Sequence, residues 1–232
     1  MEKANLNGLK TFGFNSKIEL IDFAVSKKKI LIAINAHKII NSDVETREII
    51  NANIGYPDGH GAIMALKNKN IHSIKIPGCE LWLDIINYLD SNTSYYLIGG
   101  KQNVIEQVVI KLKKEFVNIN IINHRNGFIS NIDQEADLLN DIKKHKPDVI
   151  FVAMGSPRQE LLMQKIQKMH SALFLGLGGS FDVYTGNVKR APKIWVKLNL
   201  EWAYRWLCEP KLRTKRNLDL FKFLYLLKRN KL

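Results

Sequence analysis

The feature that most constrains the fold is a regular alternation of short apolar runs with amphipathic stretches. Six runs have the length and composition of strands: Ile30–Asn35, Ile71–Ile76, Tyr95–Ile98, Ile119–Ile122, Val149–Met154 and Ala172–Leu177. Six stretches repeat apolar residues with helical spacing: Val44–Ala52, Gly61–Lys69, Glu80–Leu89, Val104–Phe116, Gln134–Lys144 and Gln159–Met169. This order favours βαβ units, and therefore an α/β protein with a Rossmann-like, mainly parallel sheet and helices on both faces.

Positive charge is concentrated at the end of the chain. The 232 residues include 35 Lys and Arg against 22 Asp and Glu, which gives a formal net charge of +13. Residues 189–232 hold 13 basic and 3 acidic residues, so their net charge is +10 and that of residues 1–188 is only +3. We therefore expect a Rossmann-like body at residues 1–188 and a basic, helical C-terminal appendage at residues 189–232.

A segment this basic requires an anionic partner, which is a nucleic acid, a phosphorylated substrate or an anionic membrane. Aromatic residues lie among the cations, including Trp195, Trp202 and Trp206. They favour a lipid headgroup boundary or a stacked base over a solvated charge run. The stretch Leu218–Leu227 is too short and too charged to span a bilayer. Two interpretations stay open for it, a helix in the membrane interface and a helix packed on the body.

Patterns that bind metals or redox cofactors are absent from the sequence. The two cysteines, Cys79 and Cys208, lack zinc-ligand spacing, and there is no His-x-x-x-His pair, Asp-x-Asp pair or Walker A loop. The glycines of Gly176–Gly179 lack the third glycine and the position of a dinucleotide fingerprint. No stretch resembles a signal peptide or a membrane span. We expect a soluble or peripheral, cytosolic protein that needs no metal and no cofactor.

Ligands of such sheets bind where strands end and loops enter helices. The segment Asn35–His37 follows the first predicted strand, and Asp58 lies between Pro57 and Gly59 just before a predicted helix. An aspartate in that position is usually a helix N-cap. The alternative is a general base, which requires a carboxylate within hydrogen-bond reach of a hydroxyl. Local sequence leaves both interpretations open.

Two glycine-containing loops have features of phosphate sites. They are Gly99-Gly100-Lys101 and the segment from Gly155 to Gln159 and Glu160. Glycines let a backbone approach a diphosphate closely, and a following helix N-terminus supplies N–H groups. Each loop also has an ordinary interpretation. The first is then a plain strand-to-helix connection, and the second a capped helix start with Glu160 at the favourable end of the helix dipole.

Five motifs follow one another along nearly the whole chain. They are Pro57-Asp58-Gly59-x-Gly61, Gly155-x-Pro157-x-Gln159-Glu160, Gly179-x-Phe181-Asp182-x-x-x-Gly186, Arg190-Ala191-Pro192 and Glu201-Trp202-x-Tyr204-Arg205-x-x-x-Glu209-Pro210. In this order they resemble the WecG/TagA/CpsF family of bacterial glycosyltransferases, from about residue 30 to residue 216.

The resemblance implies transfer of a hexose or N-acetylhexosamine from a UDP-sugar to N-acetylglucosamine on undecaprenyl diphosphate, at its 4-hydroxyl. Transfer proceeds with inversion and without a required metal. Such an enzyme acts in the synthesis of surface polysaccharide, O-antigen or teichoic acid linkages, on the inner face of the cytoplasmic membrane. The donor sugar and the oligomeric state stay open.

The resemblance also implies roles for particular residues. Asp58 matches the base that deprotonates the acceptor hydroxyl. The expected donor-binding residues are Asn35, Gly99, Gly100, Lys101, Gly155, Gln159 and Glu160. The residues expected to bind the acceptor diphosphate and the membrane are Arg190, Arg205, Arg213 and Arg216, because a guanidinium binds phosphate bidentately.

The chain departs from the family pattern in two places. Ala33 stands where many members carry threonine, two residues before Asn35, and residues 211–217 lack the aromatic residues often found there. Two other classes stay as alternatives. A basic nucleic-acid-binding α/β protein would leave the Asp58 and Gln159 loops unexplained, and a nucleotide-dependent oxidoreductase would explain only the βα pattern. We expect no nucleic acid among the partners.

Overall fold

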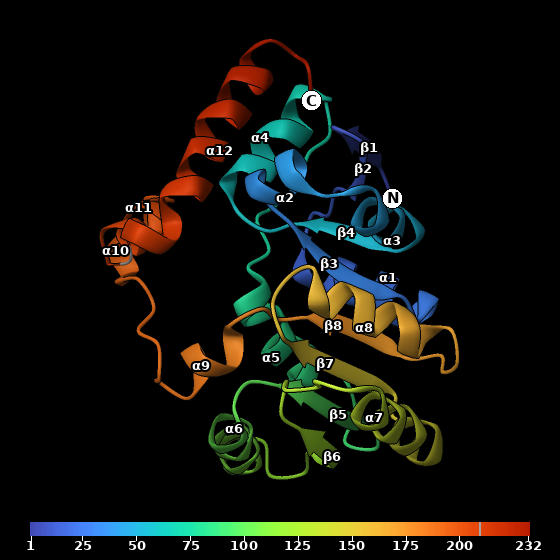
Figure 1. Ribbon diagram of the computed structural model, residues 1–232. Coiled ribbons are helices and arrows are strands. Elements are labelled where there is room, and N and C mark those ends of the chain that lie inside the picture. Colours follow the sequence, from blue (N-terminus) through green and yellow to red (C-terminus); the bar gives the residue numbers. More distant parts are fainter. Residues whose placement is uncertain (209) are drawn as a thin grey trace. The chain divides into compact units, whose positions relative to one another are not determined.

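The computed structural model describes residues 1–208 and 210–232, without the side chains of Lys193, Arg205 and residues 211–217 (Figure 1). The predicted α/β class is confirmed, since the described residues form eight strands of a mostly parallel sheet together with helices. The chain divides into two compact units. The first unit contains residues 1–16, 33–77 and 189–232, and the second contains residues 17–32 and 78–188.

In the first unit the strand order is β1-β2-β4-β3. These strands are β1 (Lys3–Leu6), β2 (Leu9–Phe12), β4 (Ile54–Pro57) and the end of β3 (Ile30–Ile34). Strand β1 is antiparallel to β2, and β2 is parallel to β4. The helices of this unit are α2 (Ala36–Asn41), α3 (Val44–Ala52), α4 (His60–Asn68), α10 (Lys193–Lys197), α11 (Glu201–Cys208) and α12 (Pro210–Lys228).

A hairpin that the sequence analysis missed begins the first unit. Its turn is Asn7-Gly8, and both residues have positive φ angles, 51° and 88°. This is the conformation that a two-residue turn between antiparallel strands requires, and Asn-Gly is the pair that adopts it most readily. Leu6 and Leu9, on either side of the turn, are fully buried. The hairpin therefore packs its apolar side chains into the core.

The strand predicted at Ile71–Ile76 is wrong. This segment makes isolated hydrogen bonds in place of a ladder: the Ile74 N–H donates to the Phe14 carbonyl at 2.9 Å, and the Ile76 N–H donates to the Pro57 carbonyl at 3.0 Å. Ile76 is fully buried all the same. The apolar pattern therefore reflects burial of an irregular connection, which periodicity alone does not distinguish from a strand.

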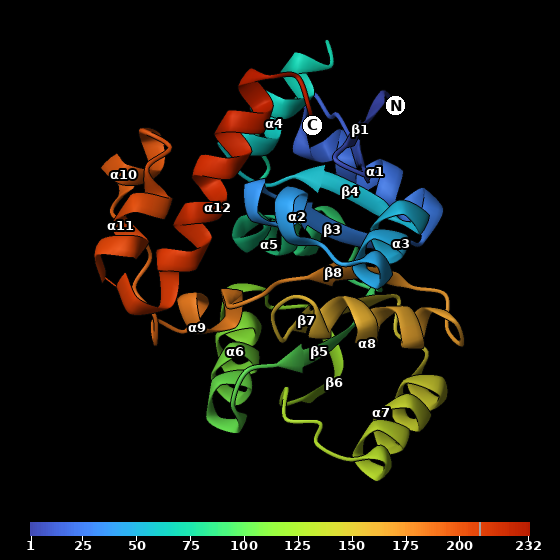
Figure 2. The same ribbon diagram turned by 45° about the horizontal axis from the view of Figure 1, so that its top comes forward.

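The C-terminal helix α12 packs on α2 and α4, and the three helices lie side by side in both ribbon views (Figures 1 and 2). Phe223 of α12 is fully buried. A Cβ atom on Gly61 would lie 3.1 Å from Ala36 Cβ and 3.3 Å from Phe223 Cε1. The glycine of α4 therefore lets α12 approach closely, as glycine does elsewhere where elements pack tightly.

In the second unit the strands run in the order β3-β8-β7-β5-β6, and every pair is parallel. They are the start of β3, β8 (Leu173–Gly176), β7 (Val149–Ala153), β5 (Ser94–Gly99) and β6 (Asn120–Arg125). The helices are α1 (Lys17–Lys27), α5 (Gly78–Tyr88), α6 (Gln102–Glu115), α7 (Ile132–His145), α8 (Arg158–Gln167) and α9 (Ser180–Tyr184). Five of the six predicted strands and all six predicted helices are confirmed, within a few residues at their ends.

An aromatic cluster fills the core of the second unit. The ring of Trp82 makes edge contacts with Phe151, Phe181 and Tyr184, at centroid distances of 5.8, 5.6 and 5.0 Å. Trp82, Phe151 and Phe181 are fully buried. The phenylalanine of the third sequence motif therefore has a packing role, since such pairs stabilise a core beyond their area burial.

A polar network crosses the second unit at Asp141 of α7. Its carboxylate accepts hydrogen bonds from Tyr96 Oη and Asn123 Nδ2, both at 2.6 Å, and lies 2.9 Å from His145 Nδ1. Burial acts to raise the pKa of the Asp141 carboxyl, but these hydrogen bonds and the nearby imidazole outweigh it and hold the pKa below its usual value. The ionised carboxylate therefore stabilises the fold.

We predict that Asp141→Asn destabilises the protein by about 1–3 kcal/mol at neutral pH. A lowered folded-state pKa contributes stability above the unfolded pKa of about 3.9, and this contribution is lost as pH falls through the folded value. The variant should therefore lose less stability than the wild type between about pH 6 and about pH 3 in urea unfolding. Asp137→Asn removes a charge from an exposed position of the same helix and should keep the wild-type slope.

Candidate active site

Asn35 and Asp58 lie together at the ends of neighbouring strands in the first unit. Asn35 follows β3, and Asp58 follows β4. The Asp58 N–H donates to the Ile34 carbonyl at 2.8 Å, which joins the two strand ends. Both residues are half-exposed. The first unit therefore presents an amide and a carboxylate at the edge where sheets of this class bind ligands.

The side chain of Asn35 also has a local partner. Its Oδ1 accepts a hydrogen bond from the Lys38 N–H at 3.0 Å, so Asn35 is the N-cap of α2. This contact leaves the Nδ2 group available as a donor. Asn35 is therefore held in one orientation by the helix that it begins.

The capping interpretation of Asp58 is wrong. Helix α4 begins at His60, and its N-cap is Gly59, which has a φ angle of 101° and offers no side chain. A Cβ atom on Gly59 would have no neighbour within 4 Å. The space at Gly59, the residue after Asp58, is therefore open. A carboxylate in this position, half-exposed and outside the helix, is suited to accept a proton from a bound hydroxyl.

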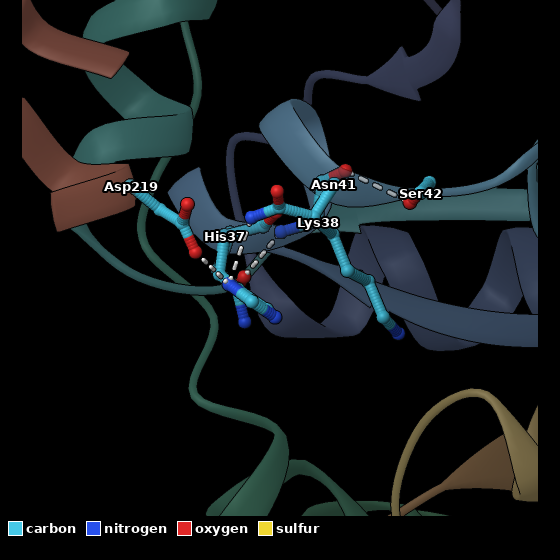
Figure 3. Close-up of polar contacts among 6 residues, drawn as sticks. His37, Lys38, Asn41, Ser42 and Asp219 are labelled. Atoms are coloured by element: carbon cyan, nitrogen blue, oxygen red, sulfur yellow. Dashed lines mark hydrogen bonds and ion pairs between the residues drawn. The ribbon is translucent and has the colours of Figure 1, made fainter. Parts of the chain in front are cut away.

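His37 of α2 lies close to α12 in the same unit (Figure 3). Its Nδ1 atom is 2.9 Å from Asp219 Oδ2 and 3.1 Å from Asn41 Nδ2. The side chain of Asp219 is only 14% exposed, whereas that of His37 is 43% exposed. The sequence analysis did not anticipate this pair, although Asp219 is the one acid in the basic stretch 210–232.

In the second unit, Gly99 and Gly100 form a sharp turn after β5. Their φ angles are 138° and 66°, and a Cβ atom on Gly99 would lie 2.2 Å from the Ala153 carbonyl oxygen. The Gly100 N–H donates to that same oxygen at 3.2 Å. Lys101, which is exposed, precedes the first turn of α6. The glycines are therefore required by close strand packing, and the exposed N-terminus of α6 is the part of the turn that can contact a ligand.

The loop after β7 contains Gly155, with a φ angle of 76°, and leads into α8. Gln159 and Glu160, in the first turn of α8, are 5% and 0% exposed. The Gln159 Nε2 group donates to Glu160 Oε1 at 3.2 Å, while Gln159 Oε1 accepts from the Gly178 N–H at 2.9 Å. Gln159 therefore connects the start of α8 to the loop that follows β8.

That loop, at Gly176–Gly179, was set aside as a dinucleotide fingerprint and was not predicted to bind a ligand. Gly178 has a φ angle of 58°, and Cβ atoms on Gly178 and Gly179 would have no neighbour within 4 Å. Their backbone is therefore accessible, beside the start of α8. A glycine run directly after a buried strand is the signal that could have identified this loop without the dinucleotide fingerprint.

The four predicted arginines lie in the C-terminal part of the first unit. Arg190 is half-buried. Arg205 lies in α11, and Arg213 and Arg216 lie in α12, but their side chains are outside the described part of the structure. Among the described residues no group of three or more His, Cys, Asp and Glu side chains is arranged to hold a metal ion. In the same residues, no helix has the length and hydrophobicity needed to cross a membrane.

We predict that Gln159→Leu loosens the Gly178 loop, because it removes the acceptor of the Gly178 N–H. Hydrogen exchange of the Gly178 amide should accelerate about tenfold or more. The Gly127 amide, which donates to the Gly100 carbonyl at 2.9 Å, is an internal control and should exchange at the wild-type rate. Equal exchange of Gly178 in both proteins would contradict the connecting role of Gln159.

Comparison with protein families agrees with the motifs. A family model described as "Glycosyl transferase WecG/TagA/CpsF family" matches residues 8–232, nearly the whole chain. The match includes both units and the C-terminal helices.

Proposed function

The chain belongs to the WecG/TagA/CpsF family of glycosyl transferases, and from this premise we propose that it transfers a hexose or N-acetylhexosamine from a UDP-sugar to N-acetylglucosamine on undecaprenyl diphosphate. Membership of the family makes the protein a glycosyltransferase of cell-envelope polysaccharide synthesis, with a sugar donor and a lipid-linked acceptor. We further propose that the nucleotide is UDP, that the lipid is undecaprenyl diphosphate, that the 4-hydroxyl is the acceptor and that the anomeric configuration inverts. We also propose that the enzyme acts at the inner face of the cytoplasmic membrane.

The observation that carries the proposal is the environment of Asp58. Its backbone is fixed to Ile34, its side chain is half-exposed, and open space lies beside Gly59. In the proposed reaction the Asp58 carboxylate takes the proton of the acceptor hydroxyl. The hydroxyl oxygen then forms a bond to the anomeric carbon, and the bond from that carbon to the diphosphate oxygen breaks. UDP leaves with the electron pair, and the anomeric configuration inverts.

The donor diphosphate is proposed to bind at the glycine loops of the second unit. The N-terminus of α6, with Lys101 beside it, supplies N–H donors and a positive dipole end. The N–H of Gly178 is held by Gln159, and the accessible backbone of the next residue, Gly179, supplies a further donor. Such preorganised donors stabilise the charge that develops on the leaving UDP, which is why the proposed reaction does not require a metal. Buried Gln159 and Glu160 act in this scheme by supporting the loops.

The acceptor is proposed to bind at the C-terminal helices. One side of α12 buries Phe223 and Leu227, while Leu218, Phe221, Leu224 and Tyr225 are exposed. Lys222, Lys228 and Arg229 are exposed as well. Apolar side chains beside cations favour the interface of an anionic membrane. Arg190, Arg205, Arg213 and Arg216 would then bind the lipid diphosphate, as guanidinium groups bind phosphate bidentately.

We predict that Asp58→Asn lowers kcat for sugar transfer by about 10²–10⁴-fold, because the amide does not accept a proton from the acceptor hydroxyl. Binding of UDP, measured by calorimetry, should keep its wild-type Kd. Asn35→Ala is the comparison variant and should retain more transfer than Asp58→Asn, since it leaves the base in place. Near-normal turnover of Asp58→Asn would show that another group is the base.

The membrane contact predicts a second result. Replacing Phe221 and Tyr225, which are 65% and 55% exposed, by serine should lower the partition coefficient on phosphatidylglycerol–phosphatidylcholine vesicles about tenfold or more. Vesicle sedimentation measures the bound fraction. Ile110→Ser changes a side chain of the second unit that is 69% exposed and should leave the bound fraction unchanged. Equal sedimentation of the double variant and the wild type would contradict membrane docking through α12.

A further inference from the structure

Helix α12 packs on α2 and α4 of the same unit through side chains that recur every four residues. Asp219, Phe223 and Leu227 are four residues apart, so they lie on one face of the helix. Phe223 and Leu227 are buried and supply the apolar contact. Asp219, with only 14% of its side chain exposed, is the polar member of this face. The packed face of α12 therefore combines two apolar side chains with one carboxylate.

The apolar contact and the polar contact fix different properties of the helix. Burial of Phe223 and Leu227 favours docking but is non-directional, so it tolerates small rotations and shifts of α12. The 2.9 Å contact between Asp219 Oδ2 and His37 Nδ1 is directional. It fixes the rotation of α12 at one turn, where the helix meets α2 (Figure 3). The apolar contact therefore holds the helix, and the polar contact sets its register.

The chemistry of the pair determines which atom carries the hydrogen. An ionised carboxylate only accepts hydrogen bonds, so His37 Nδ1 must be protonated and donate to Asp219. Nδ1 then has no lone pair for the Asn41 Nδ2 group 3.1 Å away, which donates to the His37 carbonyl at 3.3 Å instead. His37 Nδ1–H can make this hydrogen bond whether the imidazole is neutral or charged. It requires a donor at the Nδ1 position, and asparagine can also supply one there.

The location of the pair links it to the candidate site. His37 lies two residues after Asn35, on the helix that Asn35 caps. Asp219 lies two residues after the stretch 211–217, which belongs to the same helix and includes Lys211, Arg213, Lys215 and Arg216. Asp219 is also the single acidic residue of α12. An exposed carboxylate in this helix would weaken its attraction to an anionic partner.

We infer that the Asp219–His37 hydrogen bond sets the rotation of α12 against α2, and so positions this helix for the acceptor that it is proposed to bind. Asp219 and His37 are positioning residues, and neither contacts the reacting atoms. The inference rests on the proposed function for the identity of the acceptor. It adds the contact that sets the register of the C-terminal helix.

The test uses four variants of the full chain. Asp219→Ala and His37→Ala remove the contact, and the double variant His37→Ala/Asp219→Ala completes a mutant cycle. His37→Asn keeps a donor at the Nδ1 position. Steady-state kinetics with N-acetylglucosaminyl-diphospho-lipid and the most active donor of a UDP-sugar panel give KM and kcat. Calorimetry gives the Kd of UDP, and hydrogen exchange reports on the amides of residues 218–227.

Both alanine variants should raise the acceptor KM about fivefold or more, with kcat within about twofold and an unchanged Kd for UDP. The double variant should be no worse than either single variant, because both remove the same contact. His37→Asn should return the acceptor KM to near the wild-type value. Amides of residues 218–227 should exchange faster in the alanine variants and at wild-type rates in His37→Asn.

A matched control lies at the other end of the same helix. The Asn68 Nδ2 group donates to the Leu227 carbonyl at 3.1 Å, from α4. Asn68→Ala should accelerate exchange near Leu227 and leave the acceptor KM unchanged, since this contact is distant along the helix from residues 211–217. A raised KM in this variant would show that any loosening of α12 has the same effect, and the specific role of Asp219 would be rejected.

An unchanged acceptor KM in folded Asp219→Ala and His37→Ala would overturn the inference and leave the proposed function intact. A joint fall of kcat, UDP affinity and acceptor affinity that His37→Asn does not restore would also overturn it. If the wild type transfers sugar from no member of the panel, the proposed function fails. In that case hydrogen exchange still tests the inference. Equal exchange rates of the amides of residues 218–227 in His37→Ala and the wild type would show that the contact does not determine the position of α12.

Discussion

The stretch Pro57–Gly61 is held in place from two sides, and the proposed chemistry depends on this restraint. On one side the Asp58 N–H bonds to the Ile34 carbonyl, so the proposed base is tied to the end of β3. On the other side Gly61 meets Ala36 and the ring of Phe223, so the start of α4 is in close contact with α12. One motif of five residues therefore joins the proposed base to the helix that is proposed to bind the acceptor.

Two glycines follow Asp58 in this stretch, and each is required for a different reason. Gly59 has a positive φ angle and no neighbour near its Cβ position, which leaves room beside Asp58. Gly61 lies in α4, and the absence of a side chain there leaves the space that Phe223 approaches. A substitution at Gly61 would push α2 and α12 away from α4, whereas a substitution at Gly59 would strain the loop itself.

Buried motif residues of the second unit support neighbouring loops and side chains of the protein. Gln159 and Glu160 are buried, and the amide of Gln159 is engaged with Glu160 and Gly178. Phe181 packs against Trp82. These side chains build the surroundings of the glycine loops, whose accessible backbone is proposed to face the donor. Rigidly held donors favour release of a diphosphate, because they stabilise the developing negative charge without having to reorganise.

Much of this organisation could be predicted from the sequence, because periodicity reports burial. Strands β7 and β8 of the second unit are buried on both faces, and their apolar runs identified them. Strand β4 was missed since Gly55, Tyr56 and Pro57 do not form such a run, and Ile71–Ile76 was misassigned because an irregular segment was equally apolar. The position of Asn35 followed from the predicted strand before it, and that of Asp58 from the predicted helix after it. The pairing of His37 with Asp219 could not be predicted, because it joins residues 182 positions apart through a helix packing that periodicity does not encode.

The most direct test of the central claim is product analysis after incubation with a panel of UDP-sugars and N-acetylglucosaminyl-diphospho-lipid. We predict that one donor is consumed, that UDP is released in equal amount, and that NMR shows a glycosidic bond of inverted anomeric configuration. The reaction should proceed at the same rate in excess EDTA. Retention of the donor configuration, or loss of turnover on chelation that added metal restores, would contradict direct displacement assisted by Asp58.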